Sequence, residues 1–150
     1  MAYKNLGEFI QELEQQNDLV RISLEVDPEL EITEIANRVM KSEGGGKALL
    51  FEKVKGSELP LLINALGSQT RMCRALGVQD FREIADRLEA LLQPQIPASF
   101  LEKVKKIPDL VQLANFTPKT VKSGPCQEII LRGEQASLDI LPILKCWPLD

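Results

Sequence analysis

The densest group of side chains that could do chemistry is a run of acids between residues 25 and 34. A pair of carboxylates in a cleft can exchange protons with a substrate or bind a hard cation. Acids at a strand end and a helix start are, however, common solvated groups that the helix dipole favours. We therefore interpret this cluster as a solvated surface at a strand end and a helix start. Its members are Glu25, Asp27, Glu29, Glu31 and Glu34.

The sequence GGGK at residues 44–47 offers a second possibility, a cradle for phosphate. A phosphate loop follows a strand, ends in Lys-Ser or Lys-Thr, and opens a helix. Here a helical apolar pattern precedes the glycines, and Lys47 is followed by Ala48 and a strand-like run. The order of elements is reversed, so we predict a helix end with Gly44 in the left-handed conformation.

Arg71 and Arg74 form a third candidate, beside Ser68 and Thr70. Arg71 falls in the first turn of a predicted helix, where a cation opposes the helix dipole unless an anion offsets it. The anion could be a carboxylate of this chain, which we favour, or a ligand. A small anion- or nucleotide-binding protein that uses residues 44–47 or Arg71 therefore stays open as an alternative.

The amino-acid composition excludes several kinds of catalytic and binding site. The 150 residues contain no histidine, which excludes Ser-His and Cys-His nucleophile pairs and imidazole zinc sites. A net charge of −4 argues against a nucleic-acid surface, so the lysines between residues 103 and 122 are interpreted as a solvated face. No apolar run approaches the roughly 20 residues that span a bilayer. Three scattered cysteines indicate thiols in a reducing cytoplasm: Cys73, Cys126 and Cys146.

The elements that would position these groups are short and mixed. Helical periodicity covers residues 6–13, with Asn5 as N-cap, and residues 32–39, 71–76, 81–92 and 100–106, with Thr70 capping the third. Strand patterns cover residues 19–26, 48–51, 60–64 and 126–131. This mixture predicts an α+β fold, a small sheet of short strands flanked by helices.

The last residues, ILPILKCWPLD, are far more apolar than a free terminus usually is. Such a segment needs a partner, which could be this domain's own core, a neighbouring chain or more of the same chain. We interpret Trp147 as a packing anchor and not as a platform for a ligand.

The ordered series of these motifs resembles the UbiD family of decarboxylases. NLGEFIQELE, LVRISLEVDPELEITEIANRVMK, ALLFEKVKGSELPLLINALGS and TRMCRALGV are similar to the family's N-terminal region. GPCQEIILRGEQASLDILPILKCWPLD is similar to the point where that region meets the flavin-binding domain. The resemblance implies two parts, a domain over residues 1–115, then a linker and the first strand of a split-barrel cofactor domain over residues 116–150.

The resemblance also implies a function for a longer, parent enzyme. It would be a cytoplasmic, homo-oligomeric, non-oxidative carboxy-lyase of an aromatic acid such as 4-hydroxy-3-polyprenylbenzoate, in quinone biosynthesis. Its cofactors would be prenylated FMN, Mn²⁺ and K⁺, and its partners the aromatic substrate and the rest of the decarboxylase chain. We expect no nucleic acid and at most peripheral membrane contact.

In the family, the metal ligands, the cofactor contacts and the Glu-Arg-Glu network lie downstream of the segment that ILPILKCWPLD resembles. We therefore assign no catalytic, cofactor-binding or metal residue here and expect these 150 residues to be inactive alone. The alternative from a different class is an accessory or assembly module that docks through its apolar C-terminal segment.

Overall fold

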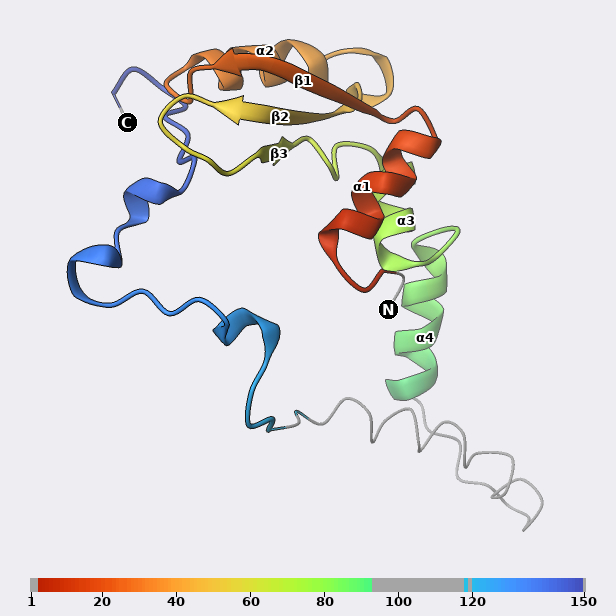
Figure 1. Cartoon of the computed structure of the whole chain (residues 1–150). Helices are drawn as coiled ribbons and strands as arrows, with labels where there is room; N and C mark the ends of the chain where they lie inside the picture. The colour runs from red at the N-terminus through yellow and green to blue at the C-terminus, as the bar shows by residue number, and fades with distance from the viewer. Residues whose placement is uncertain (1–2, 93–117, 119, 150) are drawn as a thin grey trace, which may run out of the picture. The chain divides into compact units, whose positions relative to one another are not determined.

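The structure, a computed structural model, describes residues 3–92, 118 and 120–149 (Figure 1). The chain divides into two compact units, residues 1–85 with 137–150, and residues 86–136. The predicted boundary near residue 115 and the predicted helix at 100–106 lie outside the described residues, so both stay predictions.

A three-stranded sheet organises the first unit. Strand β1 (Leu19–Val26) pairs in parallel with β2 (Ala48–Val54), which pairs antiparallel with β3 (Leu61–Ile63), giving the order β1-β2-β3. Helix α2 (Glu31–Met40) connects the parallel pair, because parallel strands need a long crossover. This mixed arrangement confirms the α+β prediction (Figure 1).

Helix α1 (Leu6–Gln15) begins where the sequence predicts. The side-chain oxygen of Asn5 accepts a hydrogen bond from the Glu8 N–H at 3.0 Å, satisfying one free amide of the first turn. The Glu8 carboxylate in turn accepts from the Lys4 N–H at 2.8 Å. Phe9 and Leu13 are the buried positions of this helix.

Two apolar clusters hold the sheet between its helices. In the first, side chains of α2 pack against β1 and β2, with members Val26, Ile32, Ala36, Leu49, Phe51 and Val54. In the second, α1 packs against the first residues of the parallel strands, with members Phe9, Leu13, Leu19, Ala48 and Leu50. Since side chains alternate along a strand, neighbouring residues of β2 contribute to different clusters.

One residue of β1 departs from the predicted pattern. Alternation predicts Leu24 on the buried face, but 78% of it is exposed. The register between β1 and β2 shifts between Ile22 and Glu25, which breaks the alternation, and Val26 returns to the core.

Two helix ends also differ from prediction. Helix α2 ends at Met40, and Gly44, left-handed as predicted (φ 68°), lies beyond it in the short 3₁₀ turn η1 (Glu43–Gly45). Helix α3 (Gln69–Leu76) is capped by Ser68 instead of Thr70, since the Ser68 hydroxyl accepts from the Arg71 N–H. Gly77 ends α3 in the left-handed conformation, with φ 68°.

The second unit contains most of helix α4 (Arg82–Leu92) and two 3₁₀ turns, η2 (Pro125–Gln127) and η3 (Gly133–Gln135). The strand predicted at residues 126–131 is wrong. A strand requires a partner for its backbone groups, and none of the described strands pairs with these residues.

The C-terminal segment belongs to the first unit from residue 137 onward and includes the 3₁₀ turn η4 (Leu138–Ile140). Leu144 packs against the α2 cluster, and Lys145 makes an isolated parallel bridge with Glu29. None of the helices in the described residues is long and apolar enough to cross a membrane.

Candidate functional site

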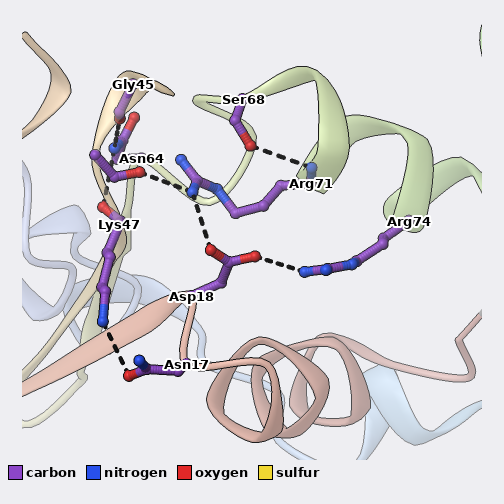
Figure 2. A network of polar contacts seen from close by, with 9 residues as sticks. Asn17, Asp18, Gly45, Lys47, Asn64, Ser68, Arg71 and Arg74 are labelled. Atoms are coloured by element: carbon purple, nitrogen blue, oxygen red, sulfur yellow. Dashed lines mark hydrogen bonds and ion pairs between the residues drawn. The ribbon is translucent and has the colours of Figure 1, made fainter. Parts of the chain in front are cut away.

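The glycine turn after α2 and the start of α3 meet at a polar network around Arg71 (Figure 2). Arg71 is 2% exposed and is the one charged residue that is buried in the described part of the chain. Its Nη1 donates to the carbonyl of Gly46 at 2.8 Å. The network therefore joins two candidates that lie far apart in the sequence, the GGGK turn and Arg71.

Asp18, at the start of β1, supplies the negative charge. One of its carboxylate oxygens accepts from Arg74 Nη1 at 2.5 Å, and the other lies 3.9 Å from Arg71 Nη1. The anion beside Arg71 is thus a carboxylate of this chain, as favoured from the sequence.

Asn64 and Lys47 tie the surrounding loops together. The Asn64 amide donates to the carbonyls of Gly45 and Lys47 at 2.8 and 2.9 Å, from a backbone with φ 59°. The Lys47 ammonium donates to the Asn17 side-chain oxygen at 2.9 Å. Figure 2 shows these contacts, which link the strand ends to the glycine turn.

Glycine is required where these loops approach most closely. A Cβ added at Gly67 would lie 1.8 Å from Asn64 Oδ1, and one added at Gly45 would lie 2.1 Å from the Gly67 carbonyl oxygen. Both distances are far inside van der Waals contact, so the two loops can pack this tightly only without side chains at these positions.

The network does not have the geometry of a phosphate cradle. A cradle points backbone N–H groups at the anion, whereas Gly45, Gly46 and Lys47 present carbonyl oxygens to Asn64 and Arg71. The Lys47 ammonium is bound to Asn17. The glycines form the turn between α2 and β2, as the predicted order of elements requires, although α2 itself ends at Met40, before Gly44. Arg71 Nε and Nη2 stay buried without a hydrogen-bond partner among the described residues.

Three members of the acidic cluster form separate ion pairs at the surface, which agrees with the predicted solvated surface. Lys55 donates to Asp27 at 2.7 Å, and this hydrogen bond holds the pKa of Asp27 below its usual value. Arg38 does the same for Glu34, and Lys145 donates to Glu29, both at 2.8 Å. Within the described ranges, no three His, Cys, Asp or Glu side chains are grouped as a metal would need.

A cleft of about 640 Å³ opens beside the network, between α1 and α3. Its lining includes Tyr3, Glu12, Cys73 and Arg74. Burial raises the pKa of Tyr3, and the neighbouring Glu12 carboxylate adds to the shift. The cleft therefore brings the Tyr3 phenol and the Glu12 carboxylate together beside Arg74.

Sequence reasoning missed Asp18, Asn64 and Gly67. A signal for them exists in the spacing Asn64-x-x-Gly67-Ser68-x-x-Arg71, which combines a turn residue, a glycine and an N-cap directly before a buried arginine. The pairing with Asp18 joins positions 53 residues apart by the Arg71–Asp18 contact, and no local pattern carries it.

Comparison with known proteins identifies the family. The family described as "3-octaprenyl-4-hydroxybenzoate carboxy-lyase N-terminal domain" (UbiD_N) matches residues 10–91, more than half of the chain. The chain therefore belongs to the UbiD family, through its N-terminal domain. It is also 48% identical over 148 residues to an uncharacterized protein of Aquifex aeolicus, covering 99% of this chain and 30% of that protein.

Two solved structures are similar to this chain. An evolved dimeric form of the UbiD-class enzyme HmfF from Pelotomaculum thermopropionicum, in complex with prFMN, is 28% identical with a TM-score of 0.50. The similarity covers 63% of this chain and 21% of that one. Vanillic acid decarboxylase of Sedimentibacter hydroxybenzoicus is 34% identical over 51% of this chain and 16% of that one, with a TM-score of 0.48.

Proposed function

We propose that these residues are the N-terminal portion of a longer non-oxidative carboxy-lyase that acts on an aromatic acid. The observation that carries the proposal is the family match over residues 10–91. The chain spans about 30% of the length of the curated relative that it matches, so the activity belongs to the longer protein. A 4-hydroxy-3-polyprenylbenzoate is the substrate class that the family's description favours.

Prenylated FMN, Mn²⁺ and K⁺ are the cofactors that we propose for the longer enzyme, and the bound prFMN of the HmfF structure supports the first. The described residues do not fit these groups. The glycine turn presents carbonyl oxygens to its neighbours, and no metal-ligand cluster lies among residues 3–92 and 120–149. We therefore place the chemistry in the downstream part of the protein and derive no catalytic step from this portion.

The role that we propose for this domain is structural support of the cleft that holds the substrate, since ligand sites favour domain interfaces. Deleting residues 1–115 from the parent should therefore lower both turnover and cofactor affinity. Unchanged values for both would contradict this role. We also propose that the parent is a cytoplasmic homo-oligomer with at most peripheral membrane contact.

The activity is testable on the full-length protein loaded with prenylated FMN. A panel of 4-hydroxybenzoates with and without a 3-prenyl tail would be incubated in D₂O. Decarboxylation should place deuterium on the ring carbon that loses CO₂, and the prenylated acids should react fastest. Failure of every acid with a spectroscopically confirmed cofactor would contradict the proposal.

A second candidate is an accessory module that docks through its apolar C-terminal segment. The observation favouring it is exposure in that segment, where Ile143 is 62% exposed and Trp147 69%. The two candidates make different predictions for the coding sequence after codon 150. A reading frame that continues beyond codon 150 into a flavin domain supports the decarboxylase, and a stop codon there supports the module.

A further inference from the structure

A groove of about 490 Å³ runs between helix α2 and the C-terminal segment, within the first unit. Its walls are mostly apolar, with polar atoms from Thr33, Glu34 and Asn37 at intervals. The apolar lining is Leu30, Ala36, Met40, Ile63, Cys146 and Trp147.

The segment that forms one wall is fixed in place by backbone contacts. Leu30 N–H donates to the Lys145 carbonyl at 3.0 Å, and Lys145 N–H donates to the Pro28 carbonyl at 3.2 Å. Leu144 is packed in the α2 cluster, and Thr33 Oγ1 donates to Cys146 Sγ at 3.6 Å. The groove is therefore pre-formed by an anchored segment.

Large apolar side chains at the groove are nevertheless open to solvent. Met40 is 49% exposed, Trp147 is 69% exposed, and Leu149, two residues further along the chain, is 99% exposed. Covering apolar surface is favourable by roughly 25 cal/mol per Å². Grouped exposure of this kind marks a surface that packs against protein.

We infer that the groove is an interface for the downstream part of the same polypeptide, which follows Leu149 in the longer protein. This inference rests on the proposed function. The match covers 99% of these residues but only 30% of the Aquifex relative, so most of that relative lies outside the matched portion. Trp147 lines the groove and Leu149 lies just after it, so the chain that continues from them starts at this surface.

The groove also defines the chemistry of its occupant. The Glu34 carboxylate at its edge is already paired with Arg38, and the Asn37 amide also donates to Glu34, at 3.4 Å. Because the charged residue of the lining, Glu34, is already paired, the groove does not require a charged partner. The occupant presents an apolar strand or helix face that inserts between Met40 and Trp147.

Hydroxyl-radical footprinting of the full-length protein tests the interface. Labelling rates would be compared between the native and the urea-unfolded protein, because Met and Trp react readily. Residues at an interface core are fully desolvated, so Met40 and Trp147 should be labelled at least about ten-fold more slowly in the native protein. Leu24, which is 78% exposed and outside the groove, serves as the control and should change little. Near-equal native and unfolded rates at Met40 and Trp147 would overturn the inference.

A matched pair of variants identifies the occupant. Met40→Asp should restore Trp147 labelling, whereas Leu24→Asp and the conservative Met40→Leu should leave it protected. The protection should also be independent of protein concentration. Protection that appears only as concentration rises would mean that a second copy fills the groove, which overturns the assignment.

The footprint does not depend on turnover, so the two proposals can fail separately. Protection without decarboxylation would keep the interface and contradict the proposed activity. Decarboxylation with Met40 and Trp147 freely labelled would contradict the interface alone.

Discussion

Two charged clusters of the first unit use the same residue types in opposite ways. Around Arg71, the cation is buried and donates to a backbone carbonyl, and Asp18 is shared between two arginines. Between residues 25 and 34, carboxylates pair one by one with exposed lysines and an arginine.

The difference lies in what each contact holds. A side chain bound to the backbone of another loop fixes the path of that loop, and it is costly to remove because a buried acceptor is left unpaired. A pair of exposed side chains does not fix the backbone of another loop, and water and salt screen the attraction between its charges. The number of charged residues in a stretch of sequence therefore does not indicate how much that stretch stabilises the fold. The variants below compare the two clusters by their effect on the free energy of unfolding.

The largest effect is expected for Arg71→Ala. It removes the donor to Gly46 and opens a cavity in a closely packed site, so the free energy of unfolding should fall by about 3 kcal/mol. Urea unfolding followed by circular dichroism measures this. Arg38→Ala, at an exposed i,i+4 pair, is the matched control and should change little. If Arg71→Met is as stable as the natural chain, side-chain volume and not hydrogen bonding is what Arg71 contributes.

Gly67→Ala should come next. The added Cβ would lie 1.8 Å from Asn64 Oδ1, and Asn64 cannot move without breaking its bonds to Gly45 and Lys47. Overpacking of this kind costs about 2 kcal/mol, measurable in the same unfolding experiment. Gly124→Ala is the control, because the nearest atom to its Cβ is Cys126 Sγ at 3.7 Å. Equal effects at both glycines would show that the close approach is unimportant.

Ser68→Ala separates the observed cap of α3 from the predicted one. Loss of the hydroxyl that accepts from the Arg71 N–H should cost about 1 kcal/mol. Thr70→Ala should be close to neutral, since Thr70 lies inside the helix. A larger loss at Thr70 than at Ser68 in thermal unfolding would restore the sequence-based prediction.

The smallest effect is expected for Asp27→Asn, which keeps an acceptor for the Glu29 N–H but loses the charge that pairs with Lys55. The pKa of Asp27 is lowered and that of Lys55 is raised, both chiefly by their mutual hydrogen bond. The pair therefore stabilises the fold above the unfolded carboxyl pKa of about 3.9 and below the unfolded ammonium pKa of about 10.4.

Melting temperatures across the pH range check this last prediction. The natural chain should exceed Asp27→Asn slightly from about pH 5 to 9, and the difference should vanish as the pH falls through the lowered pKa of Asp27. A difference that persists at pH 2 would mean that the charge is not its source.

The sequence predicts local elements well because their signals are local. The α1 cap at Asn5, strand β1 and the left-handed Gly44 all follow from neighbouring residues, and the structure confirms them. The misses depend on contacts with distant parts of the chain. The exposure of Leu24 follows a register shift against β2, and the unpaired segment at residues 126–131 depends on which strands lie beside it.

The candidate site shows the same division. The sequence predicts that GGGK ends a helix and that Arg71 pairs with a carboxylate, since both follow from element order and helix electrostatics. It does not predict that Gly46 and Arg71 contact each other. That contact exists because β2 and β3 place both loops at one end of the sheet, which is a property of the pairing between strands.

The mixed pairing of the sheet also has a kinetic consequence. Strands β2 and β3 can pair as a local antiparallel hairpin, whereas Leu19 of β1 must find Ala48 of β2 across the whole α2 crossover. Non-local pairing is the slower process, because the entropy of closing the loop is lost before the contacts form. We predict that amides of β2 and β3 gain protection before those of β1 in pulse-labelled hydrogen exchange during refolding, and simultaneous protection would contradict this order. On this route β1 is the last strand to join the sheet, and the Asp18 carboxylate at its start reaches the two arginines only when the unit is otherwise assembled.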